Sequence, residues 1–309
     1  MTPSQTQSLR EEPVSGPVPR FEIPGWRSGY GIVAGITGRG PGEGRGFDLG
    51  LWTDAPVREV MTRWRAFRQA EPGFAAVILG HQVHQTRVAW HQDGTGWIHL
   101  EGVDGHGTGT RGLLLTVTVA DCIPVYIIDP VRGAIALLHS GWRGTSSGIL
   151  RVAVQALAEA SGSVPSDIII HCGVGICGDC YEVGSEVMAG CGIAHSGSGP
   201  WHADLRKVLA RQARELGVEN ISTSQWCSNH DRTEFFSHRG SAGQDGRMVA
   251  YLGIPAVDRR TGGKADTQQE QATGAGPQAT AISTTFPVAF SPVGPSARRP
   301  VRPSVFPPE

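Results

Sequence analysis

The sequence lacks the features that identify several common classes of protein. Its 27 lysine and arginine residues are balanced by 28 aspartate and glutamate residues, so no basic excess would attract nucleic acid. It contains no GxxxxGKS or GxxxxGKT phosphate-binding loop. The apolar patch at residues 286–290 is too short to span a membrane. We therefore expect neither nucleic acid nor a membrane as a partner.

The N-terminal segment also lacks a secretory signal. Residues 1–20 are polar and contain proline, without the apolar h-region that such a signal needs. Six cysteines in a chain of 309 residues without a signal peptide indicate reduced thiols rather than disulfides. We therefore expect a cytoplasmic protein.

Glycine and proline are abundant, with 43 and 21 residues, and much of this excess lies near the two ends of the chain. Residues 1–20 and 258–309 are polar and show neither helical nor strand periodicity, so we predict that both segments are disordered. The remaining residues, 21–257, have the length of one ordinary domain.

Strand-like and helix-like patterns alternate along this domain. Apolar runs predict strands at residues 30–36, 74–80, 113–119, 124–128, 133–138 and 167–172. Helical spacing and capping residues predict helices at residues 55–71, 145–160, 181–188 and 204–216. The alternation predicts an α/β or layered α+β domain with a mixed β-sheet core.

Three potential metal ligands, His84, Cys122 and His139, each end or follow a predicted strand. Adjacent strand ends are a natural meeting place for distant residues, although any one of the three alone is equally typical of a buried core. Two histidines and one cysteine supply three ligands, the number expected for a catalytic zinc with an open fourth position. The set therefore predicts a catalytic site rather than a structural one.

Two arginines near these segments are candidates for phosphate binding. Arg143 precedes a predicted helix N-terminus at Thr145–Ser147, where backbone N–H groups and the guanidinium would attract an anion. Arg39 lies in the glycine-rich loop 35–44, which is of the kind that can cradle phosphate but lacks a GxGxxG pattern. A surface salt bridge is the alternative for Arg143, and a mobile surface loop for residues 35–44.

Two carboxylates are candidates for proton transfer. Asp121 directly precedes Cys122, and Glu182 is placed by the predicted helix 181–188 at a helix N-terminus. His238 and Arg239 follow two phenylalanines and are candidates for further polar contacts, although a structural histidine is the more common case.

Cys177 and Cys180 form a C-x2-C pair. A zinc ribbon needs a second pair at matching spacing, and the remaining cysteines are isolated in the sequence: Cys172, Cys191 and Cys227. We therefore do not expect a metal or redox role for this pair.

Five motifs in their order resemble the YfiH-type laccase-domain family: QVH, ADC, HSGWRG, CYEVG and FFSHR, within residues 30–254. Members are described as polyphenol oxidases, purine nucleoside phosphorylases and peptidoglycan editing factors. The resemblance implies a layered α/β fold with one zinc-type site on His84, Cys122 and His139. It implies a cytosolic enzyme that splits adenosine, inosine, guanosine or S-methyl-5'-thioadenosine with phosphate, with adenosine deamination as a side activity.

The sequence departs from this family at several positions. The family's HAGWRG motif has Ser140, its Asn-Leu pair reads Asp48-Leu49, and the second of two arginines after Ser-His is replaced by Gly240. The stretch before CYEVG, residues 173–178, lacks the usual proline. These differences lie at expected substrate contacts, so they bear on substrate preference more than on the metal site.

The chemistry expected at the site depends on the metal. Zinc would lower the pKa of a bound water, and Arg143, Arg39 and Arg239 would bind substrate or phosphate. Asp121 or Glu182 would act as acid or base. Copper binding is compatible with these ligands. The 11 histidines include no His-x-His pair, so laccase chemistry at a copper cluster is not expected.

Two alternatives remain open. Cys122 and His139 would also make a nucleophile dyad for amide hydrolysis, such as removal of L-serine from UDP-MurNAc-L-Ser. His84 separates the two hypotheses, because a metal site requires it and a dyad does not. A non-catalytic zinc-binding or interaction protein is the second alternative, and an open three-ligand site argues against it.

Overall fold

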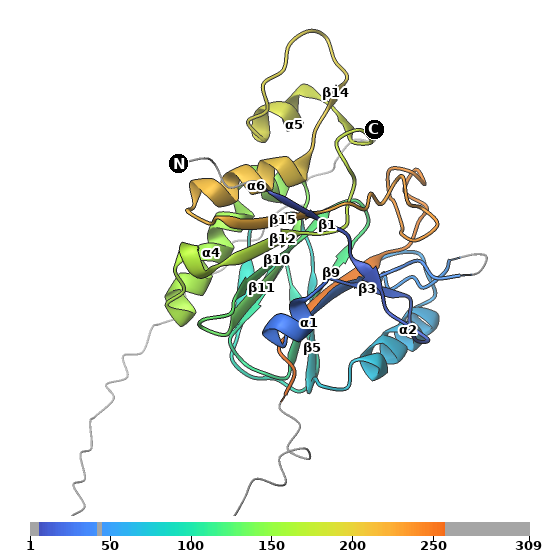
Figure 1. Cartoon of the computed structure of the whole chain (residues 1–309). Coiled ribbons are helices and arrows are strands. Elements are labelled where there is room, and N and C mark those ends of the chain that lie inside the picture. Colours follow the sequence, from blue (N-terminus) through green and yellow to red (C-terminus); the bar gives the residue numbers. More distant parts are fainter. Residues whose placement is uncertain (1–5, 42–44, 257–309) are drawn as a thin grey trace, which may run out of the picture. The chain divides into compact units, whose positions relative to one another are not determined.

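Two seven-stranded mixed β-sheets form the centre of the structure, a computed structural model that describes residues 6–41 and 45–256 (Figure 1). Sheet I has the strand order β1 (Gln7–Leu9), β15 (Asn220–Ser224), β12 (Ile169–Cys172), β10 (Ile123–Asp129), β11 (Ala134–Ser140), β8 (Gly105–Thr108) and β6 (Val88–His91). Sheet II has the order β2 (Glu12–Pro13), β3 (Arg20–Glu22), β4 (Val33–Thr37), β16 (Met248–Gly253), β9 (Leu113–Val119), β5 (Ala76–His81) and β7 (Gly96–Glu101).

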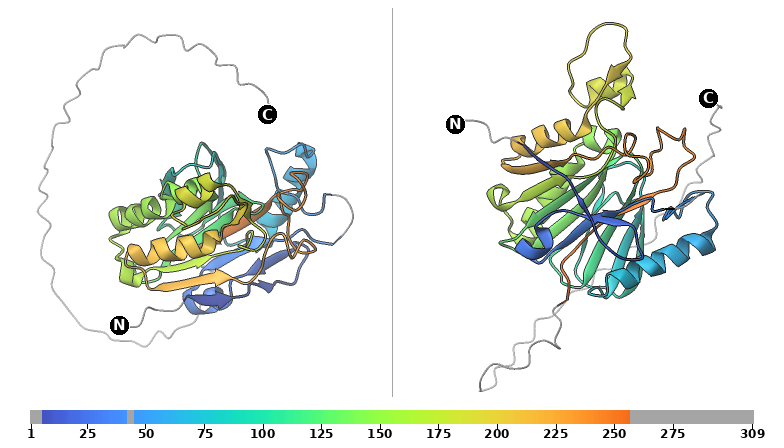
Figure 2. Two further views of the ribbon diagram at one scale, coloured as in Figure 1. Left: turned by 90° about the horizontal axis from the view of Figure 1, so that it is seen from above. Right: turned by 45° about the vertical axis from the view of Figure 1, so that its right-hand side comes forward.

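Helices cover the outer faces of both sheets. The helices are α1 (Trp26–Tyr30), α2 (Val57–Ala70), α3 (Trp142–Ser146), α4 (Ile149–Ser161), α5 (Ser185–Gly190) and α6 (Leu205–Glu215). A 3-10 turn spans Pro165–Asp167, and a small hairpin pairs β13 (Glu182–Val183) with β14 (Trp201–His202). Figures 1 and 2 show α4 and α6 against sheet I and α2 against sheet II, so the layers run helix, sheet, sheet, helix.

The continuous apolar runs of the sequence follow from this layering. In β10, Val125 and Ile127 join the core beneath α4 and α6, whereas Tyr126 and Ile128 join the core between the two sheets. A strand buried on both faces needs no alternation of apolar and polar residues. A third core lies under α2, where its buried residues recur at helical spacing: Val60, Trp64 and Phe67.

The predicted fold class is confirmed, but the prediction for the N-terminal segment is wrong from residue 6 onward. β1 pairs in parallel with β15 and so extends the edge of sheet I. Glu11 is buried, contacts His171 at 3.0 Å and accepts a hydrogen bond from Ser224 at 2.7 Å. Pairing with a sheet edge supplies partners that composition alone does not reveal. The predicted tail at 258–309 lies outside the described residues.

Two helix predictions also need correction. The predicted helix at 145–160 is split into α3 and α4, so Arg143 lies within a short helix rather than before the N-terminus of a long one. The predicted helix at 181–188 begins only at Ser185, and Glu182 belongs to the two-residue strand β13. The tertiary pairing of β13 with β14 overrides the local helical signal there.

Strand ends from both sheets meet at one end of this arrangement. β5 and β9 are parallel neighbours in sheet II, so their carboxyl ends lie at the same edge. The chain then crosses from β9 to β10 of sheet I through residues 120–122. His139 lies in β11 directly opposite Pro124 of β10, close to this crossing. The segments that carry His84, Cys122 and His139 are thereby brought together.

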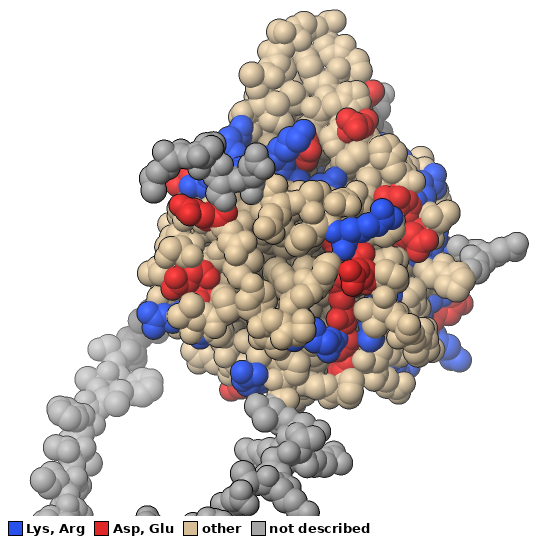
Figure 3. Space-filling model, viewed as in Figure 1, with Lys and Arg blue, Asp and Glu red and all other residues tan. Residues whose placement is uncertain are grey.

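Charged side chains are interspersed over the face shown in Figure 3, and the part that carries α5 and β14 presents few of them there. Among the described residues, the longest helices fall short of the length and apolar character that a bilayer-spanning helix requires.

Candidate functional site

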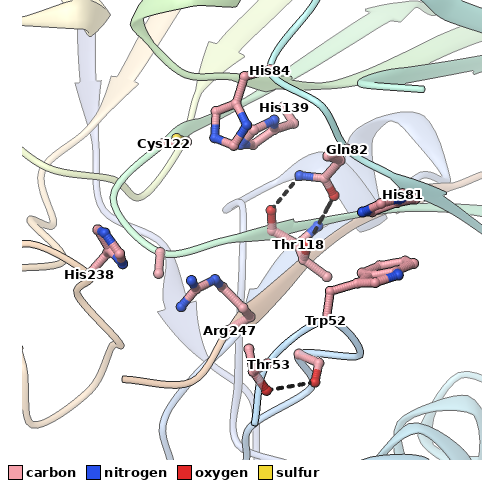
Figure 4. A pocket seen from close by; sticks show the side chains of 12 residues that line it. Trp52, Thr53, His81, Gln82, His84, Thr118, Cys122, His139, His238 and Arg247 are labelled. Carbon is pink, nitrogen blue, oxygen red and sulfur yellow. Dashed lines mark hydrogen bonds between the residues drawn. The ribbon is translucent and has the colours of Figure 1, made fainter. Parts of the chain in front are cut away.

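The three predicted ligands converge on one point. The donor atoms of His84, Cys122 and His139 all lie within 4.8 Å of one another. The two imidazole rings meet edge to face, with centroids 4.7 Å apart (Figure 4). His139 is only 3% exposed, while His84 faces the solvent side. The spatial convergence predicted from the strand ends is therefore present.

Asp104 holds two of these ligands in position. Its fully buried carboxylate accepts hydrogen bonds from the backbone N–H groups of Val83, His84 and Gln85 at 2.9–3.1 Å. The same carboxylate contacts Nδ1 of His139 at 2.9 Å. These bonds stabilise the left-handed backbone of His84, with φ of 59°, and fix the ring orientation of His139. A carboxylate behind a histidine ligand is the usual outer contact of a metal site.

Cys122 and His139 shift each other's protonation. Burial raises the pKa of the Cys122 thiol, but the nearby His139 and His84 outweigh burial and lower it below its usual value. Burial likewise lowers the pKa of His139, while Cys122 and Asp104 outweigh burial and raise it. The site therefore favours the thiolate, which is the form of cysteine that binds metals and attacks carbonyl groups.

Gly141, in the HSGWRG motif, leaves room for the sulfur. A Cβ atom at this position would lie 2.9 Å from Sγ of Cys122 and 3.3 Å from the ring of His84. Any larger residue would push the two ligands apart. The glycine is therefore required by the close approach of the backbone to the ligand cluster.

A cavity of about 310 Å³ opens beside the three ligands. It is lined by Gly50, Trp52, Thr53, His81, Gln82, His84, Thr118, Ala120, Cys122, His139, His238 and Arg247. Figure 4 shows the side chains of Arg247 and His238 across the cavity from the ligand cluster. Trp52 is 45% exposed and stacks on His81, with ring centroids 4.7 Å apart. The cavity thus combines a cluster of three metal-type donors, a guanidinium and an aromatic surface.

The side chain of Gln82, two residues before the ligand His84, binds the backbone of the neighbouring strand β9. Its side chain donates a hydrogen bond to the carbonyl oxygen of Thr118 at 2.8 Å and accepts one from the Thr118 N–H at 2.7 Å. It therefore joins the ends of β5 and β9 as another rung of backbone pairing would. This contact fixes the spacing between the segments that carry His84 and Cys122.

The arginines predicted to bind phosphate lie elsewhere. Arg39 forms an ion pair with Asp245 at 2.6 Å, and Arg143 is exposed and lies over the ring of its neighbour Trp142. None of Arg39, Arg143 and Arg239 lines the cavity. The cavity-lining guanidinium is that of Arg247, which stands in the loop where the sequence departs from the family pattern.

Arg239 lies at the edge of the site. Its guanidinium donates a hydrogen bond to the carbonyl oxygen of Glu182 at 2.8 Å and lies 5.3 Å from the centroid of the Tyr181 ring. The backbone of Glu182 is thus engaged, while its exposed side chain lies outside the cavity lining. This placement gives no support to Glu182 as an acid or base.

Asp121 binds the loop that carries His238. Its carboxylate accepts hydrogen bonds from the hydroxyls of Ser228 and Ser237 and from the backbone N–H of Arg239, at 2.6–2.7 Å. Asp121 is buried and does not line the cavity. Its contacts fit a residue that positions the neighbouring loops, rather than one that exchanges protons with a substrate.

Asp48 plays a similar part on the other side of the cavity. Its buried carboxylate accepts hydrogen bonds from the backbone N–H groups of Gly50 and Arg247, both at 2.8 Å. The aspartate that replaces the family's asparagine therefore fixes two cavity-lining segments. Sequence reasoning missed Arg247, Trp52 and Asp104 as site residues, because none of them lies in a motif with a recognisable spacing.

The fold and the site define a class of layered α/β proteins with a two-histidine, one-cysteine cluster at the wall of an open cavity. The family model described as "Multi-copper polyphenol oxidoreductase laccase" matches residues 34–255. The chain belongs to this family, which confirms the resemblance drawn from the five motifs.

Relatives of this chain carry enzyme names. It is 36% identical over 239 residues to a purine nucleoside phosphorylase of Deinococcus radiodurans, covering 74% of this chain and 89% of the relative. It is 31% identical over 252 residues to adenosine deaminase RL5 from an unknown prokaryotic organism, covering 74% and 95% respectively. The crystal structure of YlmD from Geobacillus stearothermophilus matches with a TM-score of 0.70 at 26% identity, covering 80% of this chain and all of that one.

Proposed function

We propose that this chain is a zinc-dependent purine nucleoside phosphorylase with adenosine deaminase side activity. Its expected substrates are adenosine, inosine, guanosine and S-methyl-5'-thioadenosine. The observation that carries the proposal is the convergence of His84, Cys122 and His139 on a cavity whose opposite wall presents Arg247. The relatives named purine nucleoside phosphorylase support the reaction class.

The donor set fits a divalent metal. Nδ1 of His139 is engaged by Asp104, so its other ring nitrogen is left for the metal beside the Cys122 thiolate and His84. Three protein ligands leave one position open, as in catalytic zinc sites. When bound, zinc would supply Lewis-acid polarisation and positive charge next to the reacting groups.

Arg247 and His238 would hold the phosphate. Both line the cavity, and Arg247 uses one guanidinium nitrogen to bond the carbonyl oxygens of Asp245 and Gly246, which fixes its side chain. A phosphate oxygen would form a bond to ribose C1′ while the bond from C1′ to the purine nitrogen breaks. The base leaves with the electron pair and ribose 1-phosphate remains. Fixing the two reactants together is the main contribution expected of these side chains.

Trp52 would hold the purine. Its ring stands at the cavity wall, is partly exposed and is fixed by stacking on His81. Aromatic surfaces of this kind bind planar bases by stacking. Deamination would use the same cavity, with water adding at C6 of adenosine and ammonia leaving.

Copper is the second metal that the donors would accept. Oxidation of polyphenols by a copper cluster is less favoured. Among the residues that the structure describes, metal-type donors cluster only as one set of three and one separate set of four. The sequence also has no His-x-His pair.

The test is product analysis. Purified protein is incubated with adenosine, with and without phosphate, and the products are separated by chromatography. We expect adenine and ribose 1-phosphate only when phosphate is present, and a small amount of inosine under both conditions. Cys122→Ala should abolish both products, whereas Cys191→Ala, which changes a buried cysteine outside the site, should retain them. Adenosine that survives with the wild-type protein would overturn the proposal.

One observation favours a second candidate. Asp104, His139 and Cys122 are arranged as in cysteine hydrolases. The Asp104 carboxylate contacts one side of the His139 ring, and the nearby His139 lowers the pKa of the Cys122 thiol. Such a dyad would attack an amide, release L-serine from UDP-MurNAc-L-Ser and then lose the acyl group to water. Serine release that persists in His84→Ala would favour this function over the metal-dependent one.

A further inference from the structure

A second group of metal-type donors lies outside the cavity. Its members are Cys177, Cys180, Cys227 and His230, whose donor atoms all lie within 4.8 Å of one another. The first two come from the segment between β12 and β13, and the last two from the loop that follows β15. Each half has two residues between its donors, as C-x2-C and C-x2-H. The expectation that the C-x2-C pair lacks a second donor pair is therefore wrong. The second pair is Cys227 and His230, which has a histidine in place of the fourth cysteine.

We propose that these four residues form a structural zinc site. Three cysteines and one histidine are a donor set typical of closed, four-coordinate structural zinc. With bonds of roughly 2.3 Å to sulfur and 2.0–2.1 Å to nitrogen, two ligands of a tetrahedral zinc lie about 3.6–3.8 Å apart. Sγ of Cys177 lies 3.7 Å from Nδ1 of His230, the separation expected for two ligands of one zinc ion, and one donor atom from each of the four residues lies within 4.8 Å of the others. Sγ of Cys180 lies 3.1 Å from the other ring nitrogen, Nε2, so the His230 ring or the Cys180 side chain must turn for one zinc ion to reach all four donors.

The backbone around the four donors is already arranged for this role. The Cys177 N–H points at Sγ of Cys227 at 3.3 Å, as expected for a donor to a thiolate ligand. A hydrogen bond from Cys180 N–H to the Cys177 carbonyl oxygen closes the first turn. The side chain of Asp231 accepts a bond from the Cys227 N–H at 2.9 Å and so fixes the second half.

The two halves are also paired with each other outside the donors. Gly175 and Cys227 form an isolated parallel bridge, and the Ser228 N–H donates to the Gly175 carbonyl oxygen at 3.0 Å. Cys227 is 3% exposed, and all six cysteines of the chain are free thiols. Binding of zinc would release the three thiol protons to solvent and leave the histidine neutral. The structure thus has the ligands, the spacing and the supporting contacts of a structural site.

The second cluster lies between two loops that are hydrogen-bonded to Asp121. Ser228, between Cys227 and His230 in the chain, donates its hydroxyl to Asp121, and Ile176 donates its N–H to the Asp121 carbonyl oxygen. Asp121 directly precedes the ligand Cys122. A zinc ion here would therefore fasten the two loops that support the wall of the cavity, without contacting a substrate.

The test is the metal content of the purified full-length chain, measured by elemental analysis and native mass spectrometry. Loaded with zinc, the wild-type chain should carry about two zinc ions, one per donor group. Cys122→Ala, Cys180→Ser and His230→Gln should each lose about one, and Cys122→Ala combined with His230→Gln should lose both. Cys191→Ser and His195→Gln change a cysteine and a histidine outside both groups and should keep both ions.

Cobalt substitution gives a second readout in case Cys180→Ser fails to fold. Cobalt-loaded Cys122→Ala should show an intense thiolate-to-cobalt absorption from three thiolates, and adding His230→Gln should remove this absorption. A wild-type chain that binds a single zinc, lost in Cys122→Ala, would overturn the proposal. So would a disulfide between Cys177 and Cys180 in protein prepared under reducing conditions, since a redox pair would then explain the cluster. The outcome is independent of the proposed phosphorylase activity, because the readout is zinc content and not turnover.

Discussion

The two donor groups of this chain differ in ligand number, surroundings and sequence spacing. The cavity group has two histidines and one cysteine, drawn from strand ends far apart in the chain, and it faces an open cavity. The loop group has three cysteines and one histidine, each pair closely spaced in sequence, and it links two loops. An open coordination position allows chemistry, whereas a closed set of four stabilises a fold. Loss of a ligand should therefore affect activity at the cavity group and stability at the loop group.

Removing a ligand of the cavity group should abolish activity. His84→Ala leaves Cys122 and His139 in place but removes the third ligand. Loss of a residue that only contacts a metal ligand costs about 10- to 100-fold, so loss of the ligand itself should lower the rate of phosphorolysis more than about 100-fold. The measurement is adenine release together with zinc content. His195→Ala, an exposed histidine elsewhere, is the control. Full activity in zinc-depleted His84→Ala would contradict the metal-dependent account and favour the dyad.

Removing the carboxylate behind the ligands should have the next largest effect. Asp104→Asn keeps the size of the side chain but weakens its bonds to His139 and to the His84 loop, so zinc affinity or activity should fall about 10- to 100-fold. The control is Asp129→Asn, which removes another buried carboxylate that accepts two backbone hydrogen bonds far from the cavity. An equal loss of zinc affinity in both variants would show a general folding defect instead.

The cavity indicates Arg247 as the residue that binds phosphate, whereas the sequence predicts Arg143, and substitution of each arginine distinguishes the two. Arg247→Ala should raise the KM for phosphate about tenfold, because one charge-assisted hydrogen bond is lost. Arg143→Ala should leave it unchanged, since that side chain is exposed and off the cavity lining. Steady-state rates over a phosphate series measure both. The reverse order would restore Arg143 as the phosphate residue.

A smaller effect on substrate binding is expected from loss of the Trp52 ring. Trp52→Ala should raise the KM for the nucleoside about three- to tenfold while leaving the KM for phosphate unchanged, because only stacking is lost. Trp52→Phe should recover most of this loss. A change in the KM for phosphate alone would place the base elsewhere in the cavity.

The convergence of His84, Cys122 and His139 could be predicted from the sequence because each lies at or next to the end of an apolar strand, and strand ends of the two sheets meet at one end of the fold. Asp104 could not be predicted in this way. It stands alone between β7 and β8, and its role arises only from the crossing between the two sheets. Arg247 and Trp52 likewise come from loops whose paths depend on backbone bonds to Asp48 and on ring stacking.

The second donor group shows a different reason for a missed prediction. Its first half, C-x2-C, has no second pair of cysteines at ribbon spacing, and its partner is a C-x2-H pair that begins 47 residues further along the chain, counted from Cys180 to Cys227. The ordered N-terminal segment was missed because pairing of β1 with β15 depends on a sheet edge formed far away in sequence. The layered fold class was predictable because the apolar runs of β9, β10 and β11 are buried on both faces.

The division of roles between the two groups is tested most directly by timed removal of zinc with a chelator. Zinc release, adenine release and the thermal unfolding midpoint are followed on the same sample. We predict that the cavity group, which has three ligands instead of four, loses its ion first, with loss of activity and little change in the midpoint. The loop group should lose its ion more slowly, and the midpoint should then fall. Activity that survives loss of the first ion, or a single ion whose release changes both properties together, would contradict the account.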